Sequence, residues 1–288
     1  MTTNEKALML HEEWNGKLET APKCNIRTRE DLALAYTPGV AEPCKLIAED
    51  KELAYKYTIK ANTVAVVSDG SAVLGLGNIG PYAAMPVMEG KAVLFKEFGN
   101  VNAVPICLDT QDTEEIIKTV INIAPAFGGI NLEDISAPRC FEIEERLKEA
   151  LNIPVFHDDQ HGTAIVVLAG IINALKVTGK RKEECRVVVN GAGSAGVAIT
   201  KLLLTYGFSN IIMCDKSGIL SKNSPDLNWM QKQMVEVTNL GGESGTLADA
   251  LKGADIFVGV SAPGIVSEEM VASMNKDAIL FAMANPVP

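Results

Sequence analysis

Residues 186–196 read RVVVNGAGSAG, a β-branched run that passes directly into the glycine pattern G-x-G-x-x-G. The leucine-rich segment that follows, up to Tyr206, predicts a helix. Asp215 comes nineteen residues after Gly196, at the end of the apolar run 211–214. A strand, a glycine turn, a helix and then an acid at the end of the next strand are typical of a Rossmann-type dinucleotide site, in which the turn places a pyrophosphate at the helix N-terminus.

The glycine turn and Asp215 therefore predict a bound nicotinamide dinucleotide. The residues that we expect to contact it are Gly191, Gly193, Ser194, Ala195 and Gly196 in the turn, with Asp215 on the ribose hydroxyls. Because a carboxylate repels a 2′-phosphate, Asp215 favours NAD. The adjacent Lys216 softens that preference, so NADP stays open.

A second G-x-G-x-x-G occurs at residues 75–80. No predicted strand leads directly into it, and Pro81 follows it. The pattern lacks the context of a nucleotide site, so we interpret it as a glycine-rich turn that shapes a pocket wall.

Short apolar runs and helical patterns alternate along most of the chain. The predicted strands are 63–67, 101–108, 129–132, 153–156, 186–190, 211–214, 256–260 and 279–282, and the clearest predicted helices are 113–123, 140–151, 163–176 and the segment after the glycine turn. This order predicts an α/β fold with parallel sheets. We expect an N-terminal α/β domain at 1–157, mainly helical over 1–54, and a Rossmann-like NAD(P)-binding domain at 158–288.

Two pairs of acids follow two of these strands. Glu133 and Asp134 come after 129–132, and Asp158 and Asp159 come soon after 153–156. Burying ionised carboxylates side by side is costly unless a cation joins them, and oxygen ligands suit Mg²⁺ or Mn²⁺. The acids therefore predict a divalent-metal site. The alternative is that they are helix caps or solvated loop charges, as most acids after strands are.

The segment His157–His161 also resembles the zinc-protease motif H-E-x-x-H, with Asp158 in place of Glu. That motif needs both histidines on one face of a helix. Here His157 ends a predicted strand and Gly162 follows His161, so we interpret the segment as a strand-to-helix turn.

Composition excludes several classes of function. The formal net charge is −10, and aromatic residues make up 5% of the chain, which argues against a nucleic-acid-binding protein. The apolar run 162–177 is interrupted by Gly170, Asn173 and Lys176, so we do not expect it to span a membrane. The six cysteines contain no C-x-x-C, and the first ten residues lack a signal-peptide pattern. We therefore expect a cytoplasmic enzyme with reduced thiols.

Seven short segments of the chain have distinctive residue patterns. They read AYTPGVAEP at 35–43, VSDG at 67–70, LGLGNIG at 74–80, MEGK at 88–91, NLED at 131–134, FHDDQHGT at 156–163 and ANP at 284–286. Together they resemble the malic enzymes in their short microbial form. The resemblance implies oxidative decarboxylation of (S)-malate to pyruvate and CO₂ with reduction of NAD(P), by a homodimer that depends on a divalent metal.

The resemblance also implies roles for individual residues. Glu133, Asp134 and Asp159 would ligate Mg²⁺ or Mn²⁺, which would also hold the C1 carboxylate and C2 oxygen of malate. Catalysis would use Lys91 as the base at the C2 hydroxyl, Asp158 to hold Lys91, and Tyr36 to protonate C3 of the enolpyruvate. Asn285 would contact the substrate or the nicotinamide.

Two departures from the family pattern leave alternatives open. Residues 71–73 read SAV where larger members carry an arginine that grips a substrate carboxylate. Short members continue beyond the position of Pro288, so we expect a chain truncated at its C-terminal end. The alternatives are a malolactic-type lyase that keeps NAD bound and releases lactate, and a non-catalytic dinucleotide-binding module.

Overall fold

The chain divides into two compact units in the computed structural model, which describes residues 1–73 and 75–284. The first unit comprises 1–71, 79–133 and 145–155, and the second comprises 72–78, 134–144 and the chain from Phe156 onward. The predicted domain boundary after residue 157 stays a prediction.

The first unit opens with short helices over the segment for which the sequence predicts helices. They are α1 (Thr3–Trp14), α2 (Arg29–Ala35), α3 (Ala41–Glu49) and α4 (Ala54–Tyr57), with 3-10 turns at η1 (Lys51–Leu53) and η2 (Ile59–Asn62). Thr2 and Thr28 cap α1 and α2, because each side chain accepts a hydrogen bond from the backbone three residues later.

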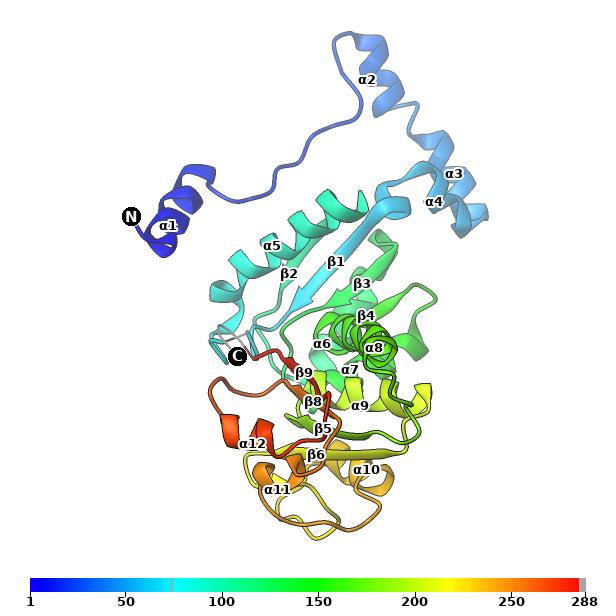
Figure 1. Cartoon of the computed structure of the whole chain (residues 1–288). Coiled ribbons are helices and arrows are strands. Elements are labelled where there is room, and N and C mark those ends of the chain that lie inside the picture. Colours follow the sequence, from blue (N-terminus) through cyan, green and yellow to red (C-terminus); the bar gives the residue numbers. More distant parts are fainter. Residues whose placement is uncertain (74, 285–288) are drawn as a thin grey trace. The chain divides into compact units, whose positions relative to one another are not determined.

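A four-stranded sheet follows, in the order β2-β1-β3-β4 (Figure 1). Its strands are β1 (Thr63–Ser68), β2 (Asn102–Cys107), β3 (Gly129–Leu132) and β4 (Val155–His157), and the accompanying helices are α5 (Gly80–Gly99), α6 (Thr113–Ile123), η3 (Ala124–Ala126) and α7 (Arg139–Ala150). Strand β1 runs parallel to both β2 and β3, with Val64 opposite Ala103 on one side and Gly129 on the other.

Helix α5 runs alongside β1 and β2 (Figure 1). The sequence patterns above do not predict it, because Pro86 and Gly90 interrupt the segment. Its buried face, which includes Met88 and Ala92, stabilises it by packing rather than by propensity.

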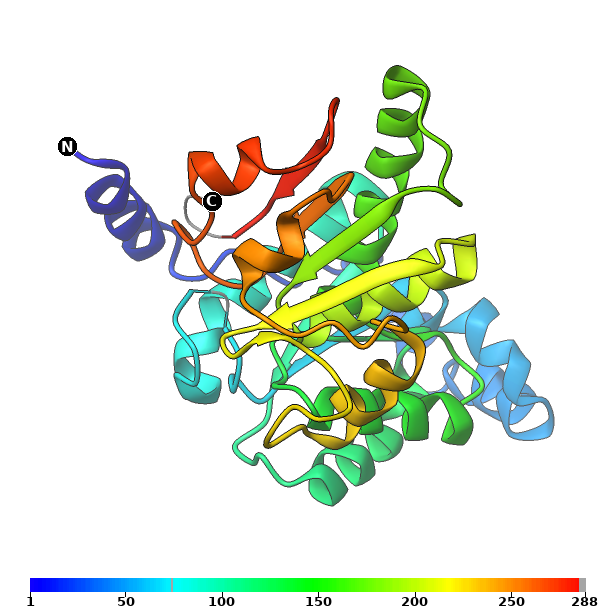
Figure 2. The same cartoon turned by 60° about the horizontal axis from the view of Figure 1, so that its bottom comes forward.

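The second unit holds a five-stranded sheet in the order β7-β6-β5-β8-β9, whose strands Figure 2 shows from the yellow β6 to the red β9. Its elements are α8 (Asp158–Thr178), β5 (Arg186–Asn190), α9 (Ser194–Tyr206), β6 (Asn210–Asp215), β7 (Gly218–Ile219), α10 (Trp229–Val237), α11 (Leu247–Leu251), β8 (Ile256–Gly259), α12 (Glu268–Ala272) and β9 (Ile279–Ala282). The sheet is parallel except for β7, which pairs antiparallel with β6. Two residues are too few to show a strand period, so the sequence does not predict β7.

Strands β5, β6 and β8 are buried on both faces, which explains why they are continuous apolar runs, whereas Leu280 and Ala282 of the edge strand β9 are exposed. Val187 and Val189 pack into a core with α8 and α9, whereas Val188 points to the opposite face and packs with α11. Successive residues of a strand point to opposite faces, so the run of three valines serves two cores.

Helix α8 begins at Asp158, about five residues before the predicted start near Thr163. Acidic residues in the first turn favour this start, because they complement the positive end of the helix dipole. The helix has 21 residues and a mean hydropathy of 1.5 in its most apolar window, so it is long and apolar enough to cross a membrane by those two measures. Val167 and Ile171 lie in the core with α9, as in the core helix of a globular domain.

Candidate active site

The two acid pairs follow neighbouring strands. Glu133 and Asp134 follow β3, and Asp158 and Asp159 follow β4. Carboxylate oxygens of Glu133, Asp134 and Asp159 all lie within 4.8 Å of one another. The structure therefore brings together the three acids that the family resemblance implies as metal ligands, because the carboxyl ends of neighbouring strands meet at one edge.

This cluster has the donor set of a divalent-cation site. Glu133 and Asp134 are only 4% and 3% exposed. Two like charges at such a separation repel by about 3–4 kcal/mol at an effective dielectric of about 20, so a nearby positive charge or a bound proton would stabilise the cluster. Three carboxylates within reach of one point, with two of them buried, fit Mg²⁺ or Mn²⁺, which bind oxygen donors.

Both oxygens of Glu133 have defined partners. Nζ of Lys91, on α5, lies 3.2 Å from Oε1 of Glu133. The Nδ2 group of Asn131 donates a hydrogen bond of 2.8 Å to Oε2. Sequence reasoning missed Asn131, although an amide inside the apolar strand β3, two residues before Glu133 and thus on the same face, is a usable signal.

The segment His157–His161 is a strand-to-helix turn, as expected, and does not form the zinc-protease motif. His157 is the last residue of β4, whereas His161 is in the first turn of α8, so the two histidines are not a pair on one helical face. Burial lowers the pKa of His157 below its usual value of 6.5, although the negative charges of Asp159 and Glu144 oppose the shift. A neutral, buried His157 is consistent with a structural role.

A buried glutamate that the sequence analysis did not single out contacts both histidines. Oε1 of Glu144, on α7, accepts a hydrogen bond of 3.1 Å from the backbone N–H of His157. Nε2 of His161 lies 2.7 Å from the same oxygen. Its signal is its place among the apolar residues Cys140, Ile143 and Leu147, which share one helical face with it.

Asp158 lies back over the first turn of α8. A Cβ atom added at Gly162 would stand 2.7 Å from Oδ1 of Asp158, so the glycine leaves room for that carboxylate. In the sequence, the one signal of this contact is an acid followed four residues later by a glycine that directly precedes a predicted helix.

Tyr36 follows α2 and is 66% exposed. Tyr36 takes no part in the contact of Lys91 with Glu133 or in the cluster of three carboxylates. Asn285 lies outside the described residues.

The glycine turn has the three features of a dinucleotide site. Gly191 adopts a φ of +120°, and a Cβ there would stand 2.9 Å from the carbonyl oxygen of Val260. A Cβ at Gly196 would stand 1.7 Å from the carbonyl oxygen of Gly191, so only glycine permits the close packing of helix on strand. A Cβ at Gly193 would meet nothing within 4 Å, which leaves the backbone open to a pyrophosphate.

The helix that follows supplies the complementary charge. Helix α9 begins at Ser194, and no side chain caps its first turn, so its N–H groups are available to an anion. Asp215 ends β6, the strand beside β5, and its Oδ1 accepts a hydrogen bond of 2.7 Å from the backbone N–H of Ser217. These positions fit a dinucleotide on the turn with Asp215 near a ribose.

The other glycine pattern forms a turn, as predicted, while its expected place in a pocket wall stays a prediction. The backbone N–H of Val73 donates to the carbonyl of Gly77, and the N–H of Leu76 donates to the carbonyl of Val73. Gly70 and Gly80 pack so closely that a Cβ at Gly70 would stand 2.2 Å from the carbonyl oxygen of Gly80. The segment leads into α5 without the strand-to-helix geometry of a nucleotide site.

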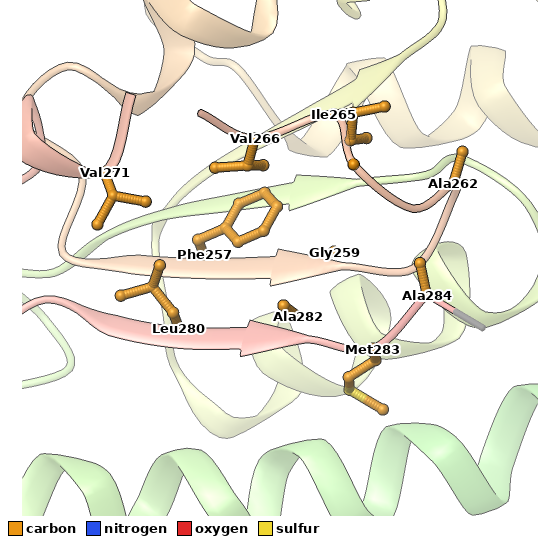
Figure 3. Close-up of a pocket in the computed structure, with 11 residues that line it drawn as sticks. Phe257, Gly259, Ala262, Ile265, Val266, Val271, Leu280, Ala282, Met283 and Ala284 are labelled. Atoms are coloured by element: carbon orange, nitrogen blue, oxygen red, sulfur yellow. The ribbon is translucent and has the colours of Figure 1, made fainter. Parts of the chain in front are cut away.

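A cavity of about 240 Å³ lies beside β8 and β9 (Figure 3). Phe257, Val266 and Leu280 line it together with other apolar or small residues. A site for a dicarboxylate needs polar or charged groups, so we do not include this cavity in the active site.

Comparison with known proteins identifies relatives for nearly the whole chain. The model of the malic enzyme N-terminal domain matches residues 15–116 and 110–148, and the model of the malic enzyme NAD-binding domain matches residues 160–288.

The chain is 59% identical over 288 residues to the NAD-dependent malic enzyme of Geobacillus stearothermophilus, covering all of this chain and 60% of that protein. It is 57% identical over 289 residues to the bifunctional malic/malolactic enzyme of Bacillus subtilis, covering all of this chain and 70% of that protein. The crystal structure of the NAD-dependent malic enzyme of Thermotoga maritima superimposes with a TM-score of 0.96 at 54% identity, over 98% of this chain and 75% of that one. The chain thus spans between about three fifths and three quarters of the length of these relatives. With both domain models matched and more than half of the residues identical to those of each relative, the chain belongs to the malic enzyme family.

Proposed function

We propose that this chain oxidises (S)-malate and decarboxylates it, giving pyruvate, CO₂ and reduced NAD(P). The observation that carries the proposal is the Lys91–Glu133 contact beside the cluster of Glu133, Asp134 and Asp159. It puts an amine that can accept a proton next to carboxylates that can hold a cation.

Glu133, Asp134 and Asp159 would hold Mg²⁺ or Mn²⁺, as their oxygen donors and burial suggest. A bound divalent cation would polarise the C2 oxygen of malate and stabilise the enolate that decarboxylation leaves. The protein's part is to keep three negative charges converged, with Asn131 and Lys91 fixing the carboxylate of Glu133.

Two residues would transfer protons, and a third would position one of them. Lys91 would take the proton of the C2 hydroxyl, and Asp158 would hold Lys91 in place. After CO₂ leaves, the hydroxyl of Tyr36 would deliver a proton to C3. The burial of Lys91, whose side chain is 20% exposed, supports its place here, because a surface lysine would stay fully solvated.

The glycine turn, with Gly191, Gly193, Ser194, Ala195 and Gly196, would bind the dinucleotide. Its nicotinamide would accept the hydride from C2 of malate. Asp215 would favour NAD over NADP, because its carboxylate repels a 2′-phosphate. Asn285 would contact the substrate or the nicotinamide.

We also propose a homodimer in the cytoplasm as the working form, with a substrate and metal domain at 1–157 and a dinucleotide domain at 158–288. The resemblance to the family supports these statements, and size measurement in solution tests the dimer.

The test is malate-dependent formation of NAD(P)H and CO₂ with Mn²⁺, run on this chain and on a version that continues past Pro288 with the corresponding part of the Geobacillus relative. Activity that requires malate, Mn²⁺ and dinucleotide together is the expected result. Failure of both proteins to form either product, while both are folded, would contradict the proposal.

A malolactic reaction is the second candidate, since the Bacillus subtilis relative is named a bifunctional malic/malolactic enzyme. It would release CO₂ and lactate from malate with no net gain of NADH. Measuring lactate and NADH in the same reaction separates the two functions.

A further inference from the structure

Glu144 is a charged residue on the apolar face of α7. It is 5% exposed, and its helical neighbours Cys140, Ile143 and Leu147 are fully buried. A carboxylate in such a position is costly unless it makes specific contacts, so its contacts indicate what it does.

Those contacts lie on both sides of Asp159. Oε1 of Glu144 accepts the backbone N–H of His157, two residues before Asp159, and stands 2.7 Å from Nε2 of His161, two residues after it. One oxygen thus hydrogen-bonds to the end of β4 and also stands close to the first turn of α8, although Nε2 of His161 does not meet hydrogen-bond geometry. The segment between these two points carries Asp159.

Asp159 itself is less constrained than the other acids of the cluster. Its side chain is 36% exposed, whereas that of Glu133 is 6% exposed. Oδ2 of Asp159 lies 3.9 Å from Nδ1 of His157, the residue whose backbone Glu144 holds. The position of the Asp159 carboxylate therefore depends on the backbone between His157 and His161.

We propose that Glu144 is a positioning residue that clamps the segment His157–His161 and so sets where Asp159 presents its carboxylate to a divalent cation. The inference rests on the proposed function, because it takes Asp159 as a metal ligand. Residues that orient metal ligands cost about 10- to 100-fold in metal affinity when they are replaced.

Three substitutions separate positioning from charge. Glu144→Gln removes the negative charge but keeps a carbonyl oxygen that can accept the His157 N–H. Glu144→Asp keeps the charge but withdraws the oxygen by one methylene, and Glu144→Ala removes both. Glu145→Ala, at the next and exposed position of α7, is the matched control.

The measurements are Mn²⁺ affinity from the electron paramagnetic resonance signal of free Mn²⁺, NADH affinity from fluorescence, and hydrogen exchange at the His157 amide. We expect Glu144→Asp and Glu144→Ala to lose about tenfold or more in Mn²⁺ affinity and to exchange the His157 amide faster. The Mn²⁺ affinity of Glu144→Gln should stay within about threefold of that of the wild type, and NADH affinity should not change in any variant.

If both Glu144→Asp and Glu144→Ala retain their Mn²⁺ affinity, this inference is overturned and the proposed function is not. Loss in Glu144→Gln with retention in Glu144→Asp would also overturn it, because that pattern reports charge and not position. If Glu144→Ala does not fold, the Mn²⁺ affinities of Glu144→Asp and Glu144→Gln decide between position and charge. A wild type that binds no Mn²⁺ would overturn both the proposed function and this inference.

Discussion

Nζ of Lys91 and Oε1 of Glu133 lie 3.2 Å apart, although 42 residues separate them in the sequence. Helix α5 carries the lysine and the end of β3 carries the glutamate. Both side chains are largely buried, so the pair is shielded from the solvent screening that weakens surface ion pairs. This pair joins the proposed base to a proposed metal ligand.

Replacing Lys91 with alanine should abolish malate turnover and leave NAD binding intact. Loss of a general base lowers the rate by about 10²- to 10⁴-fold, whereas the glycine turn that binds the dinucleotide is untouched. The measurements are kcat for malate and NADH affinity by fluorescence. Lys96→Ala, in the last turn of α5, is the control, since the amine of Lys96 bonds to Asn102 instead. Normal turnover by Lys91→Ala would refute the assignment of the base.

Mn²⁺ should stabilise the folded chain, and Asp159→Asn should remove most of that effect. A ligand at 100 times its Kd adds about 2.7 kcal/mol to the free energy of unfolding if it binds only the folded state. Thermal unfolding with Mn²⁺ and then with a chelator measures the difference. Asp277→Asn, at an exposed position, should respond to Mn²⁺ like the wild type. An equal response in Asp159→Asn would exclude Asp159 as a ligand.

Gly162→Ala should lower activity without lowering stability. The new Cβ would stand 2.7 Å from Oδ1 of Asp158 and displace that flexible carboxylate, while alanine in a helix stabilises by about 0.5–1 kcal/mol relative to glycine. The measurements are kcat and the melting temperature. In a protein that already carries Asp158→Asn, the same change should have little further effect on kcat. If Gly162→Ala lowers kcat in the Asp158→Asn protein as much as it does in the wild type, Gly162 does not act through Asp158.

Asp215→Asn combined with Lys216→Arg should shift the dinucleotide preference toward NADP. The asparagine oxygen can still accept the Ser217 N–H, so the turn is kept while the charge that repels a 2′-phosphate is removed. We expect the ratio of kcat/KM for NADP to that for NAD to rise by about tenfold or more, which corresponds to about 1.4 kcal/mol. An unchanged ratio would show that Asp215 does not contact the ribose.

The ion pair of Arg186 and Glu243 should contribute stability that depends on pH. Oε1 and Oε2 of Glu243 accept hydrogen bonds from the Arg186 guanidinium, which lower the pKa of Glu243 below its usual value of 4.5. The contribution is therefore fully present above pH 4.5 and is lost as the pH falls through the lowered pKa of the folded state.

Since Glu243 is 41% exposed, we expect only about 1 kcal/mol or less from this pair. Urea unfolding of the wild type and of Glu243→Gln at pH 7 and pH 3 measures it. The difference between the two proteins should shrink at the lower pH, and a constant difference would contradict the linkage.

The sequence by itself determined the features that are local in the chain. The dinucleotide turn is a strand, three glycines and a helix within twenty-one residues, so its conformation depends on contiguous residues. The two acid pairs were readable for a related reason: each follows a short apolar strand, and the carboxyl ends of neighbouring strands meet at one edge.

Only the tertiary structure decided which side chains converge. The acid pattern left open which of the four carboxylates meet, and the family resemblance implied Asp159. The structure brings Asp159 to Glu133 and Asp134, because the first turn of α8 points successive residues in different directions. It also placed Lys91 at Glu133, and Glu144 at the segment around Asp159. Such contacts join residues far apart in the chain, and packing, which no local pattern encodes, fixes their distances.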